Sequence, residues 1–135
     1  MLTLDAIRPD DANEMLRLAR ETSQTTHGWI YSPGAAGTVV RDGDSIRGFC
    51  LLRETAIGFV VDELWCDHSR EGIASIGLLA KWLETTVQGL ANERGCSLRL
   101  GGIVRLDNPV HRAALEKRGF APIATVLVKE YEPWA

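Results

Sequence analysis

The stretch that decides the fold is Leu64-Trp65-Cys66-Asp67-His68-Ser69-Arg70-Glu71-Gly72-Ile73-Ala74-Ser75. An apolar strand runs into a polar turn, and the turn opens a helix whose apolar residues keep helical spacing from about Ala74 to about Asn92. The free amides of such a turn point outward together, and the helix dipole adds positive potential, so the turn can bind an anion. Gly72 would let a phosphate approach the backbone closely, and Arg70 could add a charge-assisted contact. The alternative is an ordinary strand-to-helix turn with a flexible glycine.

Alternation and turn signals on both sides of this stretch predict the remaining elements. Asp42-Gly43-Asp44 indicates a tight hairpin because glycine supplies the positive φ of such turns. Asn108 is suited to cap a short helix that ends before Gly119. We expect a first strand from Leu2 that ends at Ile7-Arg8-Pro9, and a first helix that Asp10 or Asp11 can cap. Further strands are expected at residues 38–41, 45–52, 57–66, 97–104 and 124–131. This order predicts one α/β domain over residues 1–135, with a mixed central sheet and helices on both of its faces.

Composition excludes several classes of protein. The 135 residues carry 15 Lys plus Arg against 18 Asp plus Glu, and this mildly acidic balance argues against a nucleic-acid partner. A hydrophobic content of 45% and a charged content of 24% are ordinary for a globular domain. The start of the chain lacks signal-peptide features, and no uncharged run reaches the roughly 18 residues that span a membrane. We therefore expect a cytoplasmic protein that does not enter the membrane.

The three cysteines, Cys50, Cys66 and Cys96, are widely spaced and form no CxxC pair, which indicates free thiols in a reducing compartment. Cys66 and His68 are too few ligands for a zinc site, so we expect no metal. Cys66 could act as a nucleophile, but the sequence places no base beside it, and a small buried side chain is the simpler interpretation.

Two segments together carry a family resemblance. Ser69–Ala74 occupies the place of a turn of the form Gln/Arg-x-x-Gly-x-Gly/Ala, and Asn108–Phe120 occupies that of a short helix that begins with Asn and ends in a Gly-Phe pair. The opening Leu4–Ala19 and the hairpin Arg41–Phe49 are also similar to the same family. The whole pattern resembles the GNAT superfamily of acetyl-CoA-dependent N-acetyltransferases over essentially the whole chain.

The resemblance implies an enzyme that moves an acetyl group from acetyl-CoA to a primary amine, on a small molecule or a peptide, by direct attack in a ternary complex. It also implies a cofactor-binding set. The backbone of Leu64, Trp65 and Cys66 would meet the thioester and pantetheine, the amides of Arg70, Glu71, Gly72, Ile73, Ala74 and Ser75 would hold the pyrophosphate, and Asn108 would bond to the pantetheine arm.

Two positions depart from the family pattern. Ser69 stands where the turn usually has Gln or Arg, and Leu115 stands where many members carry the tyrosine that protonates the departing thiolate. Tyr31 and Tyr131 are the only tyrosines that could replace it. We therefore expect a slow enzyme. The alternative is a catalytically impaired GNAT-fold protein that binds CoA or a protein partner, and a third hypothesis is a structural or oligomerisation module.

Asp62 and Glu63 are the candidate catalytic residues. Side chains of adjacent strand residues point to opposite faces, and an unpaired buried carboxylate is costly, so at least one should be paired or face a wet cavity. The family places the acceptor amine near this strand end, where a carboxylate can accept its proton; Glu63 is slightly favoured. The alternative is a salt bridge to Arg47, Arg99 or another base.

The loop Thr22–Pro33 is either an acceptor pocket or a dimer contact, which leaves a homodimer open. Its aromatic side chains could hold an amine by cation–π contact, or could simply pack in the core. The side chains concerned are His27, Trp29 and Tyr31. His111 lies among charged residues of the short helix, where we expect it on the surface.

Overall fold

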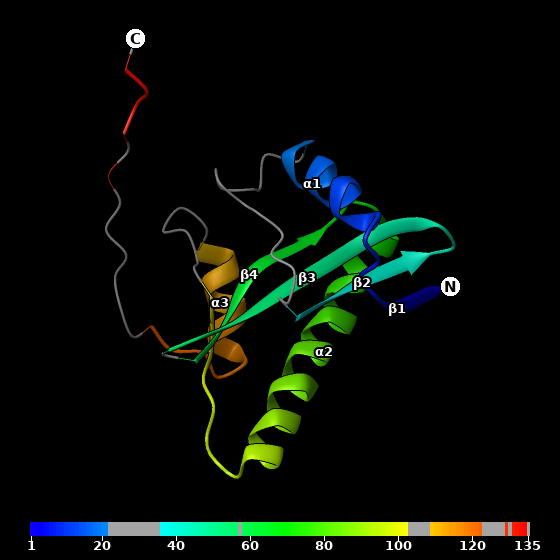
Figure 1. Ribbon diagram of the computed structural model, residues 1–135. Helices are drawn as coiled ribbons and strands as arrows, with labels where there is room; N and C mark the ends of the chain where they lie inside the picture. Colours follow the sequence, from blue (N-terminus) through cyan, green and yellow to red (C-terminus); the bar gives the residue numbers. More distant parts are fainter. Residues whose placement is uncertain (22–35, 57, 103–108, 123–128, 130, 135) are drawn as a thin grey trace. The chain divides into compact units, whose positions relative to one another are not determined.

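The computed structural model describes residues 1–21, 36–56, 58–102, 109–122, 129 and 131–134 (Figure 1). The chain groups into two compact units, an N-terminal unit, Met1–Ile103, and a C-terminal unit, Val104–Ala135. The elements of the N-terminal unit are β1 (Leu2–Ala6), α1 (Asp11–Glu21), β2 (Ala36–Asp42), β3 (Ser45–Thr55), β4 (Gly58–Cys66), α2 (Arg70–Arg94) and β5 (Leu100–Gly102). The C-terminal unit contributes α3 (Pro109–Lys117).

The five strands form one sheet in the order β1-β2-β3-β4-β5. Neighbouring strands are antiparallel except for β4 and β5, which are parallel. The helix α2 supplies the crossover between these two strands, as the sequence predicts for residues 57–104. The predicted α/β class with a mixed sheet is therefore confirmed.

Neighbouring strand residues point to opposite sides of the sheet, and apolar side chains occupy both sides. A helix therefore covers each face. On one face, α1 packs against the sheet around the stacked rings of Phe49 and Trp65, whose centroids are 5.3 Å apart. On the other face, α2 covers a second core. The α1 core consists of Met15, Ala19, Val39, Ile46, Phe49, Leu51 and Trp65, and the α2 core of Val40, Cys50, Leu52, Phe59, Leu79, Leu83 and Val87.

Several local predictions are confirmed. Gly43 has a φ of 62° in the hairpin between β2 and β3, and Gly119 has a φ of 94° just beyond the end of α3. The helix α2 begins at Arg70, about four residues earlier than predicted, because Ser69 caps it. Most of the predicted last strand, and the predicted cap Asn108, lie outside the described residues.

Two β-bulges interrupt the sheet. Between Val40 and Arg41 the pairing with β3 shifts, and Arg47 is the additional residue. Between Leu51 and Leu52 the pairing with β4 shifts, and Asp62 is the additional residue. Bulges redirect side chains, and Arg47 at the first bulge contacts Asp67 in the turn that opens α2. Of the helices in the described ranges, none has the length and apolar character of a membrane-spanning segment.

Candidate active site

The turn that opens α2 is built by its own polar residues. Ser69 caps the helix, since its Oγ accepts a hydrogen bond from the Gly72 amide at 3.0 Å. The same hydroxyl donates to Asp67 Oδ1, which also accepts from the Ser69 amide at 2.9 Å. A Cβ added at Gly72 would collide with the carboxylate and carbonyl oxygens of Asp67. Gly72 is therefore required by the packing of the turn itself.

Asp67 is anchored from a second side by Arg47. Its Oδ2 accepts from Arg47 Nη1 at 3.1 Å, and its amide donates to the Arg47 carbonyl at 3.0 Å. Burial opposes ionisation, but the hydrogen bonds from Ser69 and Arg47 prevail and hold the pKa of Asp67 below its ordinary value. A carboxylate thus sits, charged, against the inner side of the turn. No local sequence pattern marks Asp67 as part of the site, because its partner Arg47 lies 20 residues earlier in the chain.

The residues predicted to hold a pyrophosphate divide into two groups. Gly72 and Ser75 are buried, and Ser75 Oγ donates to the Gly72 carbonyl at 2.6 Å and packs against Gly48. Arg70, Ile73 and Ala74 are exposed, with Ile73 62% accessible, while Glu71 is half-buried. The outward side of the first helical turn is therefore the part of the turn that an anion can reach.

The strand β4 offers backbone groups next to this turn. Among the described residues it pairs with β5 over Phe59, Val60 and Val61. After the bulge, Glu63 to Cys66 pair with β3 on the other side. The side chains of Leu64 and Trp65 pack in the α2 and α1 cores respectively, so only their backbone is available to a ligand.

The bulge changes the expected placement of the two carboxylates. Glu63 lies opposite Leu51, a member of the α1 core, and therefore points to the α1 face. Asp62 bonds to Arg53, which follows Leu52 of the α2 core and by alternation also points to the α1 face. The expectation that the two side chains point to opposite faces is therefore wrong, because the additional residue interrupts the alternation.

Asp62 and Glu63 differ in their partners. Arg53 donates to Asp62 through a fork of three hydrogen bonds, from Nε at 2.9 and 3.2 Å and from Nη2 at 3.1 Å. Asp62 is thus in the paired state that the sequence analysis left open, with Arg53 in place of Arg47 or Arg99. Glu63 is half-buried and has no hydrogen-bond or salt-bridge partner among the described residues. Burial, and then the charge of Asp62, raise the pKa of Glu63 to about 7.

The thiols near the site are not activated. Burial, and then the nearby Asp67, raise the pKa of Cys66, which disfavours the thiolate that a nucleophile needs. Burial raises the pKa of Cys50 to about 12. Within the described ranges, no three His, Cys, Asp or Glu side chains are grouped in a way that could hold a metal ion.

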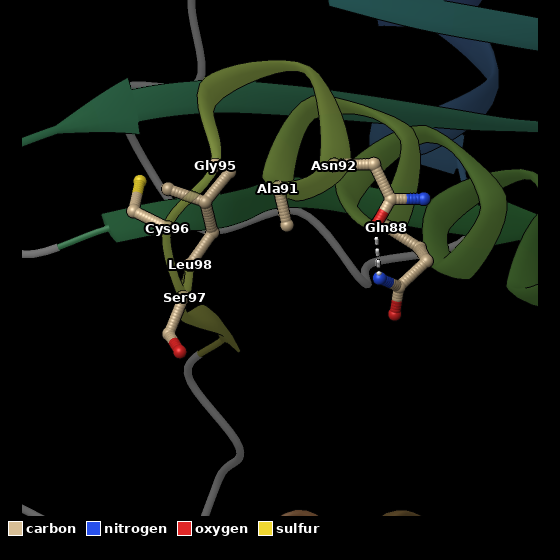
Figure 2. A pocket seen from close by; sticks show the side chains of 7 residues that line it. All are labelled: Gln88, Ala91, Asn92, Gly95, Cys96, Ser97 and Leu98. Atoms are coloured by element: carbon tan, nitrogen blue, oxygen red, sulfur yellow. Dashed lines mark hydrogen bonds between the residues drawn. The ribbon is translucent and has the colours of Figure 1, made fainter.

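A separate hollow lies at the far end of α2 (Figure 2). Its volume is about 740 Å³, and it is lined by Gln88, Ala91, Asn92, Gly95, Cys96, Ser97 and Leu98. Gln88 donates to Asn92 at 3.0 Å along its rim. Its lining begins at Gln88, which the rise of the helix places about 28 Å from the turn at Ser69. Since its lining has no carboxylate or imidazole, it is not the candidate site.

Other residues named from the sequence lie in the C-terminal unit or outside the described residues. Leu115 is half-buried in α3, and Tyr131 is 82% exposed with Lys129 Nζ 5.0 Å from its ring centre. The residues of this set that lie outside the described ranges are His27, Trp29, Tyr31 and Asn108, together with the side chain of His111.

No protein-family model matches the sequence, and a comparison with curated proteins finds no match. Solved structures do match over nearly the whole chain. The ribosomal-protein-alanine N-acetyltransferase of Brucella melitensis biovar Abortus 2308 has a TM-score of 0.70 and 16% identity, covering 98% of this chain and 100% of its own. The glucosamine-6-phosphate N-acetyltransferase of Arabidopsis thaliana has a TM-score of 0.62 and 11% identity, covering 98% and 99%. The chain has the GNAT fold.

A third match bears on the cofactor. The structure of AAC(6′)-Iy in complex with the bisubstrate analogue CoA-S-monomethyl-acetylneamine has a TM-score of 0.59 and 12% identity, and covers 98% of this chain and 99% of its own. At these identities the matches establish the GNAT fold, and the roles of individual residues rest on the geometry above. The resemblance to the GNAT superfamily stated from the sequence is confirmed at the level of the fold.

Proposed function

We propose that the protein is an acyltransferase that moves an acetyl group from acetyl-CoA to a primary amine by direct attack in a ternary complex. One observation carries the proposal: Glu63 is half-buried and unpaired among the described residues, directly after the β-bulge at Asp62. A carboxyl group whose pKa is raised to about 7 is suited to accept a proton near neutral pH. Perturbed carboxyl groups of this kind are typical of functional sites.

In the proposed reaction, the amine nitrogen forms a bond to the acetyl carbonyl carbon and the carbon–sulfur bond breaks. Glu63 accepts the proton that the nitrogen loses, either directly or through water. The electron pair of the broken bond leaves on the sulfur of CoA. Backbone amides of Leu64 to Cys66 are proposed to polarise the carbonyl oxygen, which stabilises the charge that develops there. Asp62 takes no proton in this scheme because Arg53 already pairs with it.

The residues around the turn fit the phosphates of acetyl-CoA on one side. Arg70 and Ala74 are exposed on the outward side of the first turn of α2, where the helix dipole favours an anion. The Gly72 amide is already bonded to Ser69. The proposed binding of the phosphates therefore relies on the preceding amides of Arg70 and Glu71. Acetyl-CoA supplies the activated acetyl group, and the adjacent β4 backbone is proposed to hold its pantetheine arm.

The second candidate function is a GNAT-fold protein that binds CoA, or a protein partner, with little catalysis. The charged carboxylate of Asp67 beside the turn favours it, since a negative charge there weakens phosphate binding. Leu115 favours it as well, because it cannot donate a proton to the departing thiolate. A positioned acid typically contributes about 10²–10⁴-fold, so its absence would give a slow enzyme.

Acetylated product, measured by mass spectrometry, distinguishes the two functions. Mass detection is preferable to a thiol dye because the protein has an exposed free cysteine, Cys96. Two matched structures are named for acceptors as different as a ribosomal-protein alanine and glucosamine-6-phosphate, so the amine panel should contain peptides and amino sugars.

The parent is expected to acetylate at least one acceptor, and Glu63→Gln to lose about 10²–10⁴-fold in turnover while it keeps its affinity for acetyl-CoA. Glu54→Gln is the matched control, because Glu54 is an exposed carboxylate on β3 that pairs with Arg94. Acetyl-CoA binding without product on any acceptor would favour the second function. Equal turnover in the parent and Glu63→Gln would remove Glu63 as the base.

A further inference from the structure

The bulge in β4 is bridged by one ion pair. Arg53 lies opposite Val60 on the neighbouring strand, and its guanidinium reaches diagonally to Asp62, the additional residue of the bulge. All three hydrogen bonds are between 2.9 and 3.2 Å. Forked pairing between a guanidinium and a carboxylate fixes the geometry of both groups more firmly than a single contact. The pair therefore fixes the side chain that immediately precedes Glu63.

The same pair decides the charge balance around Glu63. Asp62 and Glu63 share the α1 face, so two carboxylates stand next to each other with one cation bound to the first. If Arg53 bound Glu63 instead, Glu63 would be held ionised and could not accept a proton efficiently. If Arg53 were absent, the unbalanced charge of Asp62 would oppose ionisation of Glu63 more strongly. With Arg53 bound to Asp62, burial and then the charge of Asp62 raise the pKa of Glu63 to about 7.

The helix α1, which covers the Glu63 side of the sheet, has no unpaired charged side chain among those that the structure describes. The α1 core beside Glu63 contributes the apolar side chains Met15 and Ala19. The charged side chains of α1 that the structure describes pair as Asp11 with Arg41 and Glu14 with Arg17. On the opposite face of the sheet, burial and then the charge of Glu63 raise the pKa of the Cys50 thiol. Arg53 is thus the described cation closest in the structure to the Asp62–Glu63 pair.

We propose that Arg53 is a positioning residue for Glu63: by gripping Asp62 at the bulge, it leaves the Glu63 carboxyl unpaired and sets its charge state for accepting the amine proton. This inference rests on the proposed function. It assigns control of the protonation state of Glu63 to Arg53, which is not one of the reacting groups. Arg53 acts through Asp62 and does not touch the acceptor in this scheme.

The test measures the Glu63 carboxyl directly, by NMR titration of protein labelled with ¹³C at glutamate side chains, with Glu63→Gln used to assign the signal. Arg53→Gln removes the cation, and Arg53→Lys keeps the charge without the fork. Arg94→Gln is the matched control, because Arg94 makes a similarly exposed forked pair with Glu54 on the opposite face of β3. Acetyl transfer is measured on the same samples.

In Arg53→Gln the pKa of Glu63 is expected to rise by roughly half a unit to one unit, and the pH profile of kcat/KM to move with it. Arg53→Lys should stay within about 0.3 units of the parent and retain more turnover than Arg53→Gln. Arg94→Gln should leave the titration unchanged. An unchanged Glu63 titration in Arg53→Gln, or an equal shift in Arg94→Gln, would overturn the role of Arg53.

The titration needs no substrate, so the two proposals fail separately. A parent that shows no acetyl transfer but whose Glu63 titration responds to Arg53→Gln would contradict the proposed function and uphold the electrostatic control. A parent that turns over, with a Glu63 titration insensitive to Arg53→Gln, would contradict only the positioning role. Arg53 has 56% of its side chain exposed, so truncation is expected to leave the fold intact, which circular dichroism verifies.

Discussion

Replacing Glu63 by glutamine is expected to stabilise the folded protein above neutral pH while it removes the proposed base. Burial, and then the charge of Asp62, raise the pKa of Glu63 from its ordinary value of 4.5 to about 7. Below pH 4.5 the carboxyl is protonated in both the folded and the unfolded chain. As the pH rises from 4.5 to 7, the unfolded chain loses this proton first, so the folded state loses stability over that interval. Glutamine has no such proton to lose.

The size of the effect follows from the same pKa. One pKa unit corresponds to 1.36 kcal/mol, which sets an upper limit of about 3 kcal/mol for the cost of ionising Glu63 in the folded state. Glu63 is only half-buried, so solvent screens part of this cost, and about 1–2 kcal/mol is the realistic expectation. For a chain of this length, that difference in the free energy of unfolding between the parent and Glu63→Gln corresponds to a difference in Tm of roughly 3–6 °C.

Thermal unfolding followed by circular dichroism at pH 4 and at pH 8 measures the difference. The parent and Glu63→Gln should have nearly equal Tm values at pH 4, and the variant should be more stable at pH 8. A variant that is less stable than the parent at pH 8, or a difference that is the same at both pH values, would refute the raised pKa of Glu63. Glu63 would then lack the raised pKa on which its proposed role as a base depends.

Three further predictions concern the turn and the missing acid. Ala74→Asp adds a negative charge on the exposed side of the turn and should abolish acetyl-CoA binding by calorimetry with the fold intact, whereas the exposed mid-helix change Thr85→Asp should not; equal affinities would contradict the phosphate site. Gly72→Ala should destabilise the protein by about 2–3 kcal/mol in urea because its Cβ collides with backbone and carboxylate oxygens, whereas Gly77→Ala, which meets nothing within 4 Å, should stabilise by up to about 1 kcal/mol. Leu115→Tyr should raise the rate of CoA release at least about tenfold if the site lacks only its acid, and an unchanged rate would show that the acid is supplied elsewhere or not needed.

Local chemistry explains why much of the fold could be predicted. The hairpin at Gly43 and the end of α3 at Gly119 depend on a positive φ, which the residue type indicates directly. The α2 helix is signalled by its own periodicity, and the parallel partner of β4 by the crossover that such a helix requires. Each of these features depends on a short, continuous segment of the sequence.

The candidate site could be predicted only in part, because its decisive contacts join residues that are distant in sequence. Two carboxylates in succession in an apolar strand marked Asp62 and Glu63 as unusual, but alternation assigned them to opposite faces. The bulge depends on the register with β3, which no local pattern specifies. The choice between the two carboxylates needed the partner Arg53, and the packing role of Gly72 needed Asp67.

The buried ion pair at the start of α1 also could not be predicted from the sequence. Arg41 is buried and pairs with Asp11 at 2.5 Å, with Asp5 at 3.4 Å as a second partner. The sequence predicted Asp11 only as a helix cap. It is instead the first residue of α1, its carboxylate accepts a hydrogen bond from the preceding Arg8 amide at 2.7 Å, and it also compensates a buried cation from β2. Burial of a charge and its compensation depend on tertiary packing, which the order of residues does not disclose.

That Glu63 takes the proton of the attacking amine is tested most directly by the pH dependence of kcat/KM, compared between the parent and Glu63→Gln on one accepted amine. This ratio reports ionisations of the free enzyme and the free substrate, and the comparison cancels those of the amine. The parent is expected to show an ionisation near pH 7 that activates the reaction, and Glu63→Gln to lack it and to be slower above that pH. Parallel pH profiles with similar rates in the two proteins would contradict the assignment of Glu63 as the base.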